Sequence, residues 1–460
     1  MIKVSDNELK YRQGYLCVLF FFLILRSVNV YSFLPSIIDS GVFALLALVG
    51  IMFIVKDIWI SVVKNHQFPY SWWLVAYLFI IAASTLINHK YQFTGNVNLL
   101  VWETIYFLMI FELAREGVFT KKFYSAIAEI LIGSWFFQAV ISLGMFVTQF
   151  SYNRFYTIRD RVRIGFVENR LFGVFGEPNY GATTCLLVII LSVYFLMRGV
   201  SKKWRIFLWT NIVLQYLVIV LTGSRTALLL GMGVTAVVIF IKVLGWQRLA
   251  AWHPLLRIAV GLVLGAVGAV SLYGVVDLSK IILTKIPALF HQFDLNDHGK
   301  KDSADKINLD RADVDGNKDI SNMRFSIWMS ALQLFKSKWL LGTSPRGVVP
   351  YAQDAFPKGF IAQQGIVTHN AYINVLTSTG ILGFVAVIGF YLKQAFTVLR
   401  DAFLDKDFFR SYKGFYFLVI MVILVFGFFN NEMLLVNNVG SFIFWLFLGR
   451  LVSAATADNK

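Results

Sequence analysis

The feature that most constrains this chain is a series of apolar runs that recurs from near the N-terminus to near the C-terminus. About twelve of them reach the roughly 17 to 25 residues that a helix needs to cross the hydrocarbon of a membrane. In lipid, each backbone amide must find its hydrogen-bond partner within its own segment, so such runs fold as helices. The composition agrees, because 58% hydrophobic and 15% charged residues are too apolar for a soluble chain of 460 residues. We therefore predict an all-α, polytopic membrane protein.

The predicted spans divide the chain into three parts. They cover residues 15–37, 40–63, 70–87, 97–113, 124–150, 181–198, 205–222, 226–244, 257–276, 371–392, 413–430 and 435–453. The basic N-terminus resembles a signal peptide, but no convincing small-residue cleavage site precedes Ser36, and we interpret the first run as an uncleaved span. Spans 1 to 9 then occupy 1–276, a large loop occupies 277–370, and spans 10 to 12 occupy 371–460.

The distribution of lysine and arginine orients these spans, since basic residues in short loops are retained in the cytoplasm. They gather in alternate connections, namely Lys56 and Lys64; Arg115, Lys121 and Lys122; Arg198, Lys202, Lys203 and Arg205; Lys242, Arg248 and Arg257; and Lys393, Arg400, Lys406, Arg410 and Lys413. We predict that these loops and both termini are cytoplasmic, and that the loop at 277–370 is extracytoplasmic. The cytoplasmic loops account for most of the +16 net charge, so no nucleic-acid partner is expected.

One predicted outer loop breaks this pattern of charge. Residues 151–180 carry arginines on the face where positive charge is usually scarce, namely Arg154, Arg159, Arg161, Arg163 and Arg170. Guanidinium groups suit bidentate contact with phosphate oxygens, and all the basic residues of this loop are arginine. The loop is therefore a candidate anion-binding element. The alternatives are a misassigned topology or an ordinary solvated turn.

The large loop has two parts of different composition. Residues 294–319 are rich in Asp, Lys and Asn, which predicts a mobile or solvated segment. Asp313, Asp315 and Asp319 alternate around a glycine, but the register does not match an EF-hand and its final glutamate is missing, so we predict no calcium site. Around residues 323–338, apolar side chains recur at helical spacing and predict an amphipathic helix at the outer membrane interface.

Two cysteines and two charged residues lie inside or beside the predicted spans. Cys17 and Cys185 lie in or at the edge of apolar runs, so neither a disulfide nor a thiolate metal site is expected. Arg26 and Glu103 fall at similar predicted depths inside the first and fourth spans, where charges are costly and normally face a cavity or each other. We predict an Arg26–Glu103 ion pair with a structural rather than a catalytic role.

Four motifs occur in order between Leu171 and Gly383. They are Phe175-Gly-Glu-Pro178-Asn179, Thr222-Gly-Ser-Arg225-Thr-Ala, Arg324-Phe-Ser-Ile-Trp328 running to Leu340-Leu-Gly342, and His369-Asn370-Ala-Tyr372 followed by Gly380-Ile-Leu-Gly383. In the order and spacing of these motifs, and in its number of spans, the chain resembles the O-antigen ligase and polymerase superfamily. The spans before Leu171 match that superfamily only in character.

This resemblance implies an integral-membrane glycosyltransferase of the bacterial inner or plasma membrane. Such an enzyme takes a glycan from a polyprenyl diphosphate carrier at the outer face and joins it to a hydroxyl group of an acceptor glycan. It uses no metal, cofactor or nucleotide sugar. Its partners would be the lipid-linked glycan, the acceptor, membrane lipid and other polysaccharide-assembly proteins.

The chemistry of the motif residues is compatible with this reaction. Cleavage of the sugar–diphosphate bond develops negative charge that fixed arginines can stabilise, and a histidine can accept the proton of the attacking hydroxyl. We expect His369 and Arg225 to be catalytic, Arg324, Arg161, Arg163 and Arg170 to bind the diphosphate, and Asn370, Tyr372 and Asn179 to support them. This hypothesis requires Arg225 and His369 on the same outer side of the membrane.

Each of these residues also has an ordinary structural interpretation. His369 stands directly before a span, where it could cap a helix or lie at the interface. Arg225 could cap its span and extend toward the lipid headgroups. Arg324 could pair with an aspartate of the large loop. It is the placement of all these residues at one membrane face that favours the catalytic interpretation.

Three functions fit a chain of this kind. We favour a polymerase that joins lipid-linked repeats into O-antigen, capsule or exopolysaccharide. A ligase that passes the finished glycan to a lipid or protein acceptor is the alternative, and no residue that we can name separates the two. A polysaccharide or lipid transporter is the alternative from another class. Transporters usually show internal repeats and polar or helix-breaking residues at the membrane midplane, whereas the candidate chemistry here gathers at one face.

Overall fold

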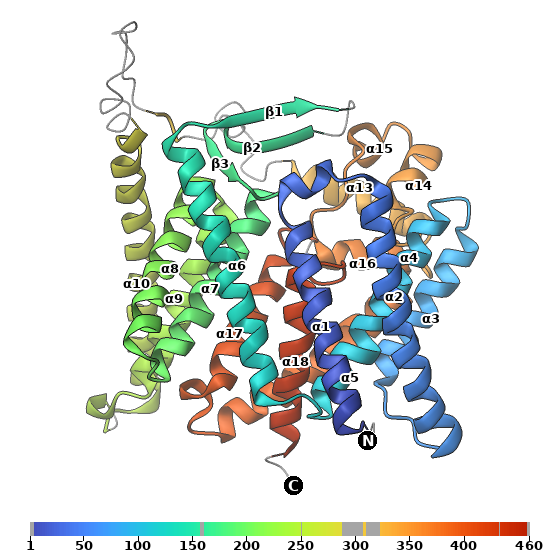
Figure 1. Cartoon of the computed structure of the whole chain (residues 1–460), viewed down its shortest axis with the longest axis horizontal. Coiled ribbons are helices and arrows are strands. Elements are labelled where there is room, and N and C mark those ends of the chain that lie inside the picture. Colours follow the sequence, from blue (N-terminus) through green and yellow to red (C-terminus); the bar gives the residue numbers. More distant parts are fainter. Residues whose placement is uncertain are drawn as a thin grey trace, which may run out of the picture. The chain divides into compact units, whose positions relative to one another are not determined.

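The computed structural model describes residues 4–156, 161–249, 251–287, 307–309, 323–431 and 433–457. It is 76% helix and 4% strand, as the apolar runs predict (Figure 1). Most of the predicted solvated segment 294–319, including the positions considered for calcium, lies outside the described residues. Its described part contributes Leu309 to an apolar cluster with Leu171 and Val276.

Every predicted span overlaps a helix of the structure. Within the described residues, nine helices are long and apolar enough to cross a membrane, namely Ser36–Lys64, Phe93–Arg115, Lys121–Val147, Pro178–Met197, Lys202–Thr222, Arg225–Leu244, Pro254–Leu283, Ala371–Leu404 and Val439–Ala457. Two further predicted spans coincide with the shorter apolar helices Trp72–Ile87 and Tyr412–Phe426. The chain is therefore a multi-pass membrane protein by helix length and composition, and the total of twelve spans stays a prediction.

The remaining predicted span is the first, and its limits differ from the prediction. Helix α1 runs from Asp6 to Arg26, whereas the apolar run predicted a span at 15–37. The chain leaves the helix here because Val28 pairs with Phe175 in a β-bridge and the Asn29 amide donates to the Val174 carbonyl, 2.6 Å away. A long-range backbone partner thus replaces the helical one, and apolarity alone does not reveal it.

The described chain forms two compact units. Unit 1 comprises Met1–Arg26, Leu34–Ile127 and Asp319–Lys460, and unit 2 comprises Ser27–Phe33 and Ala128–Lys318. Helix α6 (Lys121–Val147) runs from the first unit into the second. These units follow packing, so they cut across the predicted division at residues 276 and 370, which concerns membrane topology.

Unit 1 is built around its C-terminal helix. Its elements are α1, α2 (Ser36–Ile58) continued by η2 (Trp59–Lys64), α3 (Trp72–Ile87), α4 (Phe93–Thr104) continued by η3 (Ile105–Phe111) and α5 (Glu112–Arg115), α13 (Arg324–Ser337), α14 (Val348–Ala355), α15 (Phe360–Gln364), α16 (Ala371–Leu404), η5 (Phe408–Arg410), α17 (Tyr412–Phe426) and α18 (Val439–Ala457). The buried ring of Trp445 in α18 contacts the rings of Phe107, Phe111 and Phe390. In Figure 1, α1 begins and α18 ends at one end of this unit, and α13 to α15 lie at the other.

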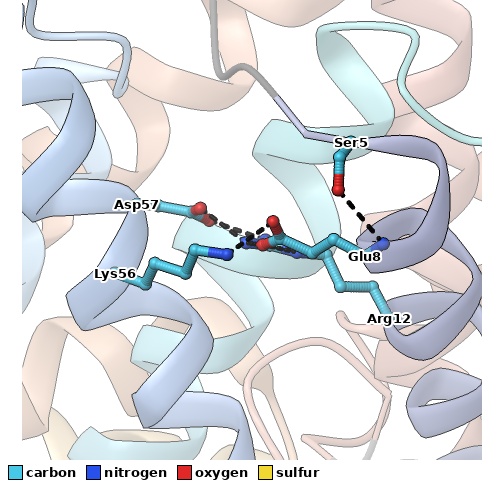
Figure 2. A network of polar contacts seen from close by, with 5 residues as sticks. All are labelled: Ser5, Glu8, Arg12, Lys56 and Asp57. Atoms are coloured by element: carbon cyan, nitrogen blue, oxygen red, sulfur yellow. Dashed lines mark hydrogen bonds and ion pairs between the residues drawn. The ribbon is translucent and has the colours of Figure 1, made fainter.

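A network of ion pairs joins α1 to α2 near the end of unit 1 where α1 begins (Figure 2). The fully buried Arg12 guanidinium donates two hydrogen bonds to Asp57, at 2.6 and 2.7 Å. It also donates to Glu8, whose second carboxylate oxygen accepts from Lys56 at 2.6 Å. Because buried charges are costly unless paired and hydrogen-bonded, this network fixes how the two helices pack.

Helix α16 is broken at Gly380, where another segment of the chain crosses it. Gly380 has φ 66° and ψ −168°, a backbone conformation essentially limited to glycine. Residues 339–344 lie against the break: the Thr343 and Ser344 amides donate to the Thr377 and Ser378 carbonyls, at 3.1 and 2.9 Å. These hydrogen bonds satisfy carbonyls that the broken helix leaves open, as a membrane interior demands.

The crossing depends on a second glycine. A Cβ atom built on Gly342 would lie 2.3 Å from the carbonyl carbon of Ser378, and one built on Gly380 would lie 2.3 Å from the carbonyl of Leu340. The Asn88 side chain donates to the Gly342 carbonyl at 3.0 Å and so ties the crossing to the end of α3. Gly342 and Gly380 come from two different sequence motifs, and both allow the backbone of residues 339–344 to contact the backbone of α16 directly.

Unit 2 combines four membrane helices with a small sheet. Its elements are η1 (Asn29–Phe33), the later part of α6, β1 (Ser151–Phe155), β2 (Arg161–Val167), β3 (Arg170–Gly173), α7 (Pro178–Met197), α8 (Lys202–Thr222), α9 (Arg225–Leu244), η4 (Gln247–Leu249) and α10 (Pro254–Leu283). The strands are antiparallel in the order β1-β2-β3, with Ser151 opposite Gly165 and Val167 opposite Arg170. The sheet lies at one end of the unit 2 helices (Figure 1). The described part of the predicted arginine loop thus contains a sheet, and Arg159 lies outside the described residues.

The amphipathic helix predicted around 323–338 is present as α13. Its buried residues include Ile327, Ala331 and Leu334, at the helical spacing that predicted it. This face packs against α14 and α15 in one apolar cluster that contains Val348 and Ile361. The apolar face therefore packs within the protein, whereas the sequence predicted that it lies at the membrane interface.

Candidate functional site

His369 directly precedes α16, and its neighbour caps that helix. The Asn370 carboxamide oxygen accepts hydrogen bonds from the Tyr372 and Ile373 amides, each at 3.0 Å. Capping is therefore done by Asn370, and the predicted alternative of a capping histidine does not hold. Among the described residues, no hydrogen bond to the His369 side chain is found, and the residue is half-buried. The imidazole remains able to exchange a proton.

The end of α17 holds the His369–Tyr372 motif in place. The Ala371 amide donates to the Gly427 carbonyl at 2.7 Å, the Asn370 side chain to the Phe428 carbonyl at 3.1 Å, and the Tyr372 hydroxyl to the Leu424 carbonyl at 2.8 Å. These carbonyls belong to the last turn of α17 and the residues that follow it, where no intrahelical donor remains. Asn370 and Tyr372 thus fix the segment that carries His369, and their supporting role in a reaction stays a prediction.

Helix α13 approaches the same segment. The Trp328 indole donates to the carbonyl of Thr368 at 3.2 Å. Arg324, the first residue of α13, donates to the Phe429 carbonyl at 3.4 Å, and its guanidinium lies 5.8 Å from the centre of the Phe429 ring. The structure therefore brings together two predicted residues, Arg324 and His369, through α13 and the end of α17.

The surroundings of His369 favour its neutral form. Burial lowers the pKa of His369 below its usual value, and the positive charge of Arg324 lowers it further. A neutral imidazole is the form that accepts a proton. The pair therefore combines a proton acceptor with a fixed positive charge.

In unit 2, Arg225 begins helix α9 after a very short turn. Gly223 ends α8 in the left-handed conformation, with φ 58°, and the Ser224 hydroxyl caps α9 by accepting from the Ala227 amide at 3.2 Å. Arg225 itself is exposed. The Thr222-Gly-Ser-Arg225 motif is therefore a two-residue turn that presents an arginine at a helix N-terminus, where anions are favoured.

The arginines of the sheet differ in their surroundings. Arg161 and Arg163 lie on β2 with 25% and 34% of their side-chain surface exposed, and both pair with Glu168, at 2.5 and 3.3 Å. Arg170 begins β3, is only 7% exposed and donates to the Thr222 carbonyl at 3.0 Å. Its guanidinium is also 3.4 Å from the Asn179 carboxamide oxygen. The predicted diphosphate contacts thus include two accessible arginines and a buried one.

The predicted pairing of Arg26 with Glu103 is wrong. Arg26 ends α1 and pairs with Asp39 at the start of α2, 2.9 Å away. The buried Glu103 forms no ion pair among the described residues, and the positive charge that acts on it electrostatically is that of Arg346. The helix ends earlier than the apolar run predicts, which places Arg26 beside Asp39.

Sequence reasoning missed the roles of two residues that shape these sites. Glu177 caps α7 by accepting from the Tyr180 amide at 2.7 Å, and a carboxylate just before Pro178 was an available signal. Arg346 lies two residues after the segment 339–344 that crosses α16, and its amide donates to the Asn96 side-chain oxygen at 2.7 Å. No local pattern marks Arg346, because its neighbours come from distant parts of unit 1.

A comparison with protein-family models matches part of the chain. Residues 210–388 match the model described as O-antigen ligase. This match supports membership of the O-antigen ligase and polymerase superfamily. The matched segment contains Arg225, Arg324 and His369, and it begins after the residues of the sheet. A comparison with curated proteins gives no match.

An enzyme that handles glycans in a membrane is supported by the match to this family. Its members are membrane enzymes that handle glycans, and their substrates are a polyprenyl-linked glycan and an acceptor. The predicted sites belong to two sets in the structure. Unit 1 holds His369, Asn370, Tyr372 and Arg324, and unit 2 holds Arg161, Arg163, Arg170, Asn179 and Arg225.

Proposed function

We propose that this protein polymerises polyprenyl-diphosphate-linked oligosaccharide repeats into a surface polysaccharide at the outer face of a bacterial inner membrane. Both termini face the cytoplasm in this proposal. The observation that supports it best is the neighbouring placement of Arg324 and His369 on the segment that the superfamily match covers. An enzyme that attacks a sugar diphosphate needs both a proton acceptor and fixed positive charge.

Each residue has a defined role in the proposed reaction. An acceptor hydroxyl oxygen attacks the anomeric carbon of the donor sugar, and the bond between that carbon and the diphosphate oxygen breaks. His369 takes the hydroxyl proton, while the electron pair of the broken bond leaves with the diphosphate. Arg225 and Arg324 stabilise the resulting charge, and Arg161 and Arg163 are further diphosphate contacts. Arginines supply the positive charge, so the proposal includes no metal ion and no cofactor.

The pH dependence of the reaction follows from the pKa of His369. Because the neutral imidazole is the base, turnover should fall as the pH drops through that pKa, with a midpoint below about 6.5. In Arg324→Gln, one cause of the lowered pKa is removed, so the midpoint should move to higher pH while the overall rate falls. The pH profile of kcat/KM of the purified protein measures both effects. A midpoint that stays in place or moves down in Arg324→Gln contradicts the pairing.

The size of the surface polysaccharide distinguishes a polymerase from a ligase, since both fit the superfamily equally well. Deleting the gene should leave products of a single repeat on the carrier if the protein is a polymerase. Full-length chains that remain unattached to their acceptor would instead identify a ligase. Gel analysis of extracted polysaccharide and lipid-linked glycan reads both outcomes. A deletion strain carrying the wild-type gene is the control.

A further inference from the structure

Arg170 differs from the other arginines of the sheet in how its guanidinium is used. It is 7% exposed, and its Nε atom donates to the Thr222 carbonyl at 3.0 Å. A terminal nitrogen faces the Asn179 carboxamide oxygen at 3.4 Å, and the charge also acts on Glu177. Arg161 and Arg163 lie on the same sheet with much more exposed surface. A residue that must meet an incoming diphosphate needs accessible donors, and those of Arg170 contact the protein.

The carbonyl that Arg170 binds is close in sequence to Arg225. Thr222 is the last residue of α8, and only Gly223 and Ser224 separate it from Arg225. This turn has little freedom, because Gly223 adopts φ 58° and the Ser224 hydroxyl is bound to the Ala227 amide. Fixing the Thr222 carbonyl therefore fixes the start of α9.

A chain of hydrogen bonds connects Arg170 to the start of α7. The Asn179 side chain accepts from Arg170 and donates to one Glu177 carboxylate oxygen at 2.7 Å. The other carboxylate oxygen of Glu177 accepts from the Tyr180 amide, also at 2.7 Å. The residues of the Glu177-Pro-Asn179 motif thus hold the guanidinium through a different nitrogen from the one that binds Thr222.

The strand that carries Arg170 is itself anchored. The Val174 amide donates to the Ser142 hydroxyl at 3.1 Å, and the Val174 carbonyl accepts from the Asn29 amide at 2.6 Å. Both contacts follow β3 directly, so the strand end is held against α6 and the segment after α1. Arg170 therefore connects one fixed segment to the turn before Arg225.

From these contacts we propose that Arg170 is a positioning residue that holds the α8–α9 turn and thereby places Arg225, and that it does not bind the diphosphate. This inference rests on the proposed role of Arg225. In this proposal the Phe175–Asn179 motif orients Arg170. Arg225, together with the more exposed Arg161 and Arg163, then remains among the unit 2 arginines expected to meet the substrate.

The test compares glutamine substitutions at the two arginines in the full-length protein. In Arg170→Gln a neutral amide can still donate to the Thr222 carbonyl, so turnover should stay within about threefold of wild type. In Arg225→Gln the charge at the leaving group is lost, and turnover should fall by roughly 100-fold or more. Inhibition by inorganic pyrophosphate supplies a second measurement, since it reports anion binding directly. Its inhibition constant should rise in Arg225→Gln and stay near wild type in Arg170→Gln.

Two further variants complete the design. Arg170→Ala removes the hydrogen bond, and combining it with the weakened Arg225→Lys should cost little beyond Arg225→Lys alone, because a residue that acts through Arg225 is not additive with it. Arg248→Gln changes an exposed arginine at the other end of α9 and controls for general loss of charge. If Arg170→Ala does not fold, Arg170→Gln still decides. A loss of turnover and of pyrophosphate inhibition in Arg170→Gln equal to that in Arg225→Gln overturns the proposal. If pyrophosphate inhibits wild type but Arg225→Gln retains full turnover, the proposed role of Arg225 fails instead.

Discussion

Replacing His369 by alanine should reduce glycan transfer by roughly 100-fold to 10,000-fold, the range that a general base commonly contributes. Asn370 caps α16 and the end of α17 holds the motif, so the fold does not depend on the imidazole. The protein should therefore insert and accumulate normally while product formation collapses. Transfer is measured as elongation of lipid-linked repeats by the purified protein in liposomes.

The backbone at His369 calls for a second variant. Its φ is 46°, in the left-handed region where any residue with a Cβ, histidine included, is strained by about 1 to 2 kcal/mol. Asparagine tolerates this region better, so His369→Asn removes the base with less strain. His89→Ala, at an exposed histidine after α3, is the matched control and should behave as wild type. Normal product levels in His369→Asn would end the proposal that this residue is the base.

Replacing Gly380 by alanine should destabilise unit 1 strongly. The residue has φ 66°, and its Cβ would lie 2.3 Å from the Leu340 carbonyl, so the crossing segment and α16 must separate. Backbone strain and overpacking together should cost roughly 2 to 5 kcal/mol. Gly342→Ala should have a similar effect, because its Cβ would meet the Ser378 backbone at 2.3 Å. Thermal unfolding in detergent, followed by size-exclusion chromatography, measures the loss.

The control for this experiment is a glycine in the same unit with open space around it. A Cβ on Gly14 in α1 would meet nothing within 4 Å, and alanine is the better helix former. Gly14→Ala should therefore unfold at or slightly above the wild-type temperature. If Gly380→Ala unfolds together with Gly14→Ala, the two backbones do not cross as closely as the structure indicates.

The sequence predicted the helices well because the constraint on them is local. Each long apolar run must satisfy its own backbone in lipid, and every predicted span overlaps a helix. The α13 helix was also predicted from the spacing of its apolar residues, including Ile327 and Ala331. Its surroundings were not, since the same apolar face fits a lipid interface or a protein partner equally well.

The strand β2 in the arginine loop was not predicted, although the sequence contains a signal for it. Residues 161–167 alternate between accessible and buried positions, with Val162 and Ile164 buried, which is the period of a strand. The charges of Arg161 and Arg163 by themselves do not indicate this period. A period-two reading of the same residues would have found the strand, although not the partner strands that complete the sheet.

The sequence by itself determined the membrane class, the position of the helices and the identity of the motifs, because these depend on runs and spacings along the chain. Only the tertiary structure decided what the motif residues contact. Arg26 pairs with Asp39 instead of Glu103, Arg170 faces Thr222, and Gly342 meets the backbone of Ser378. The physical reason is separation along the sequence. Hydrogen bonds within a helix join residues close in sequence, whereas ion pairs and backbone crossings join residues that only the packed chain brings together.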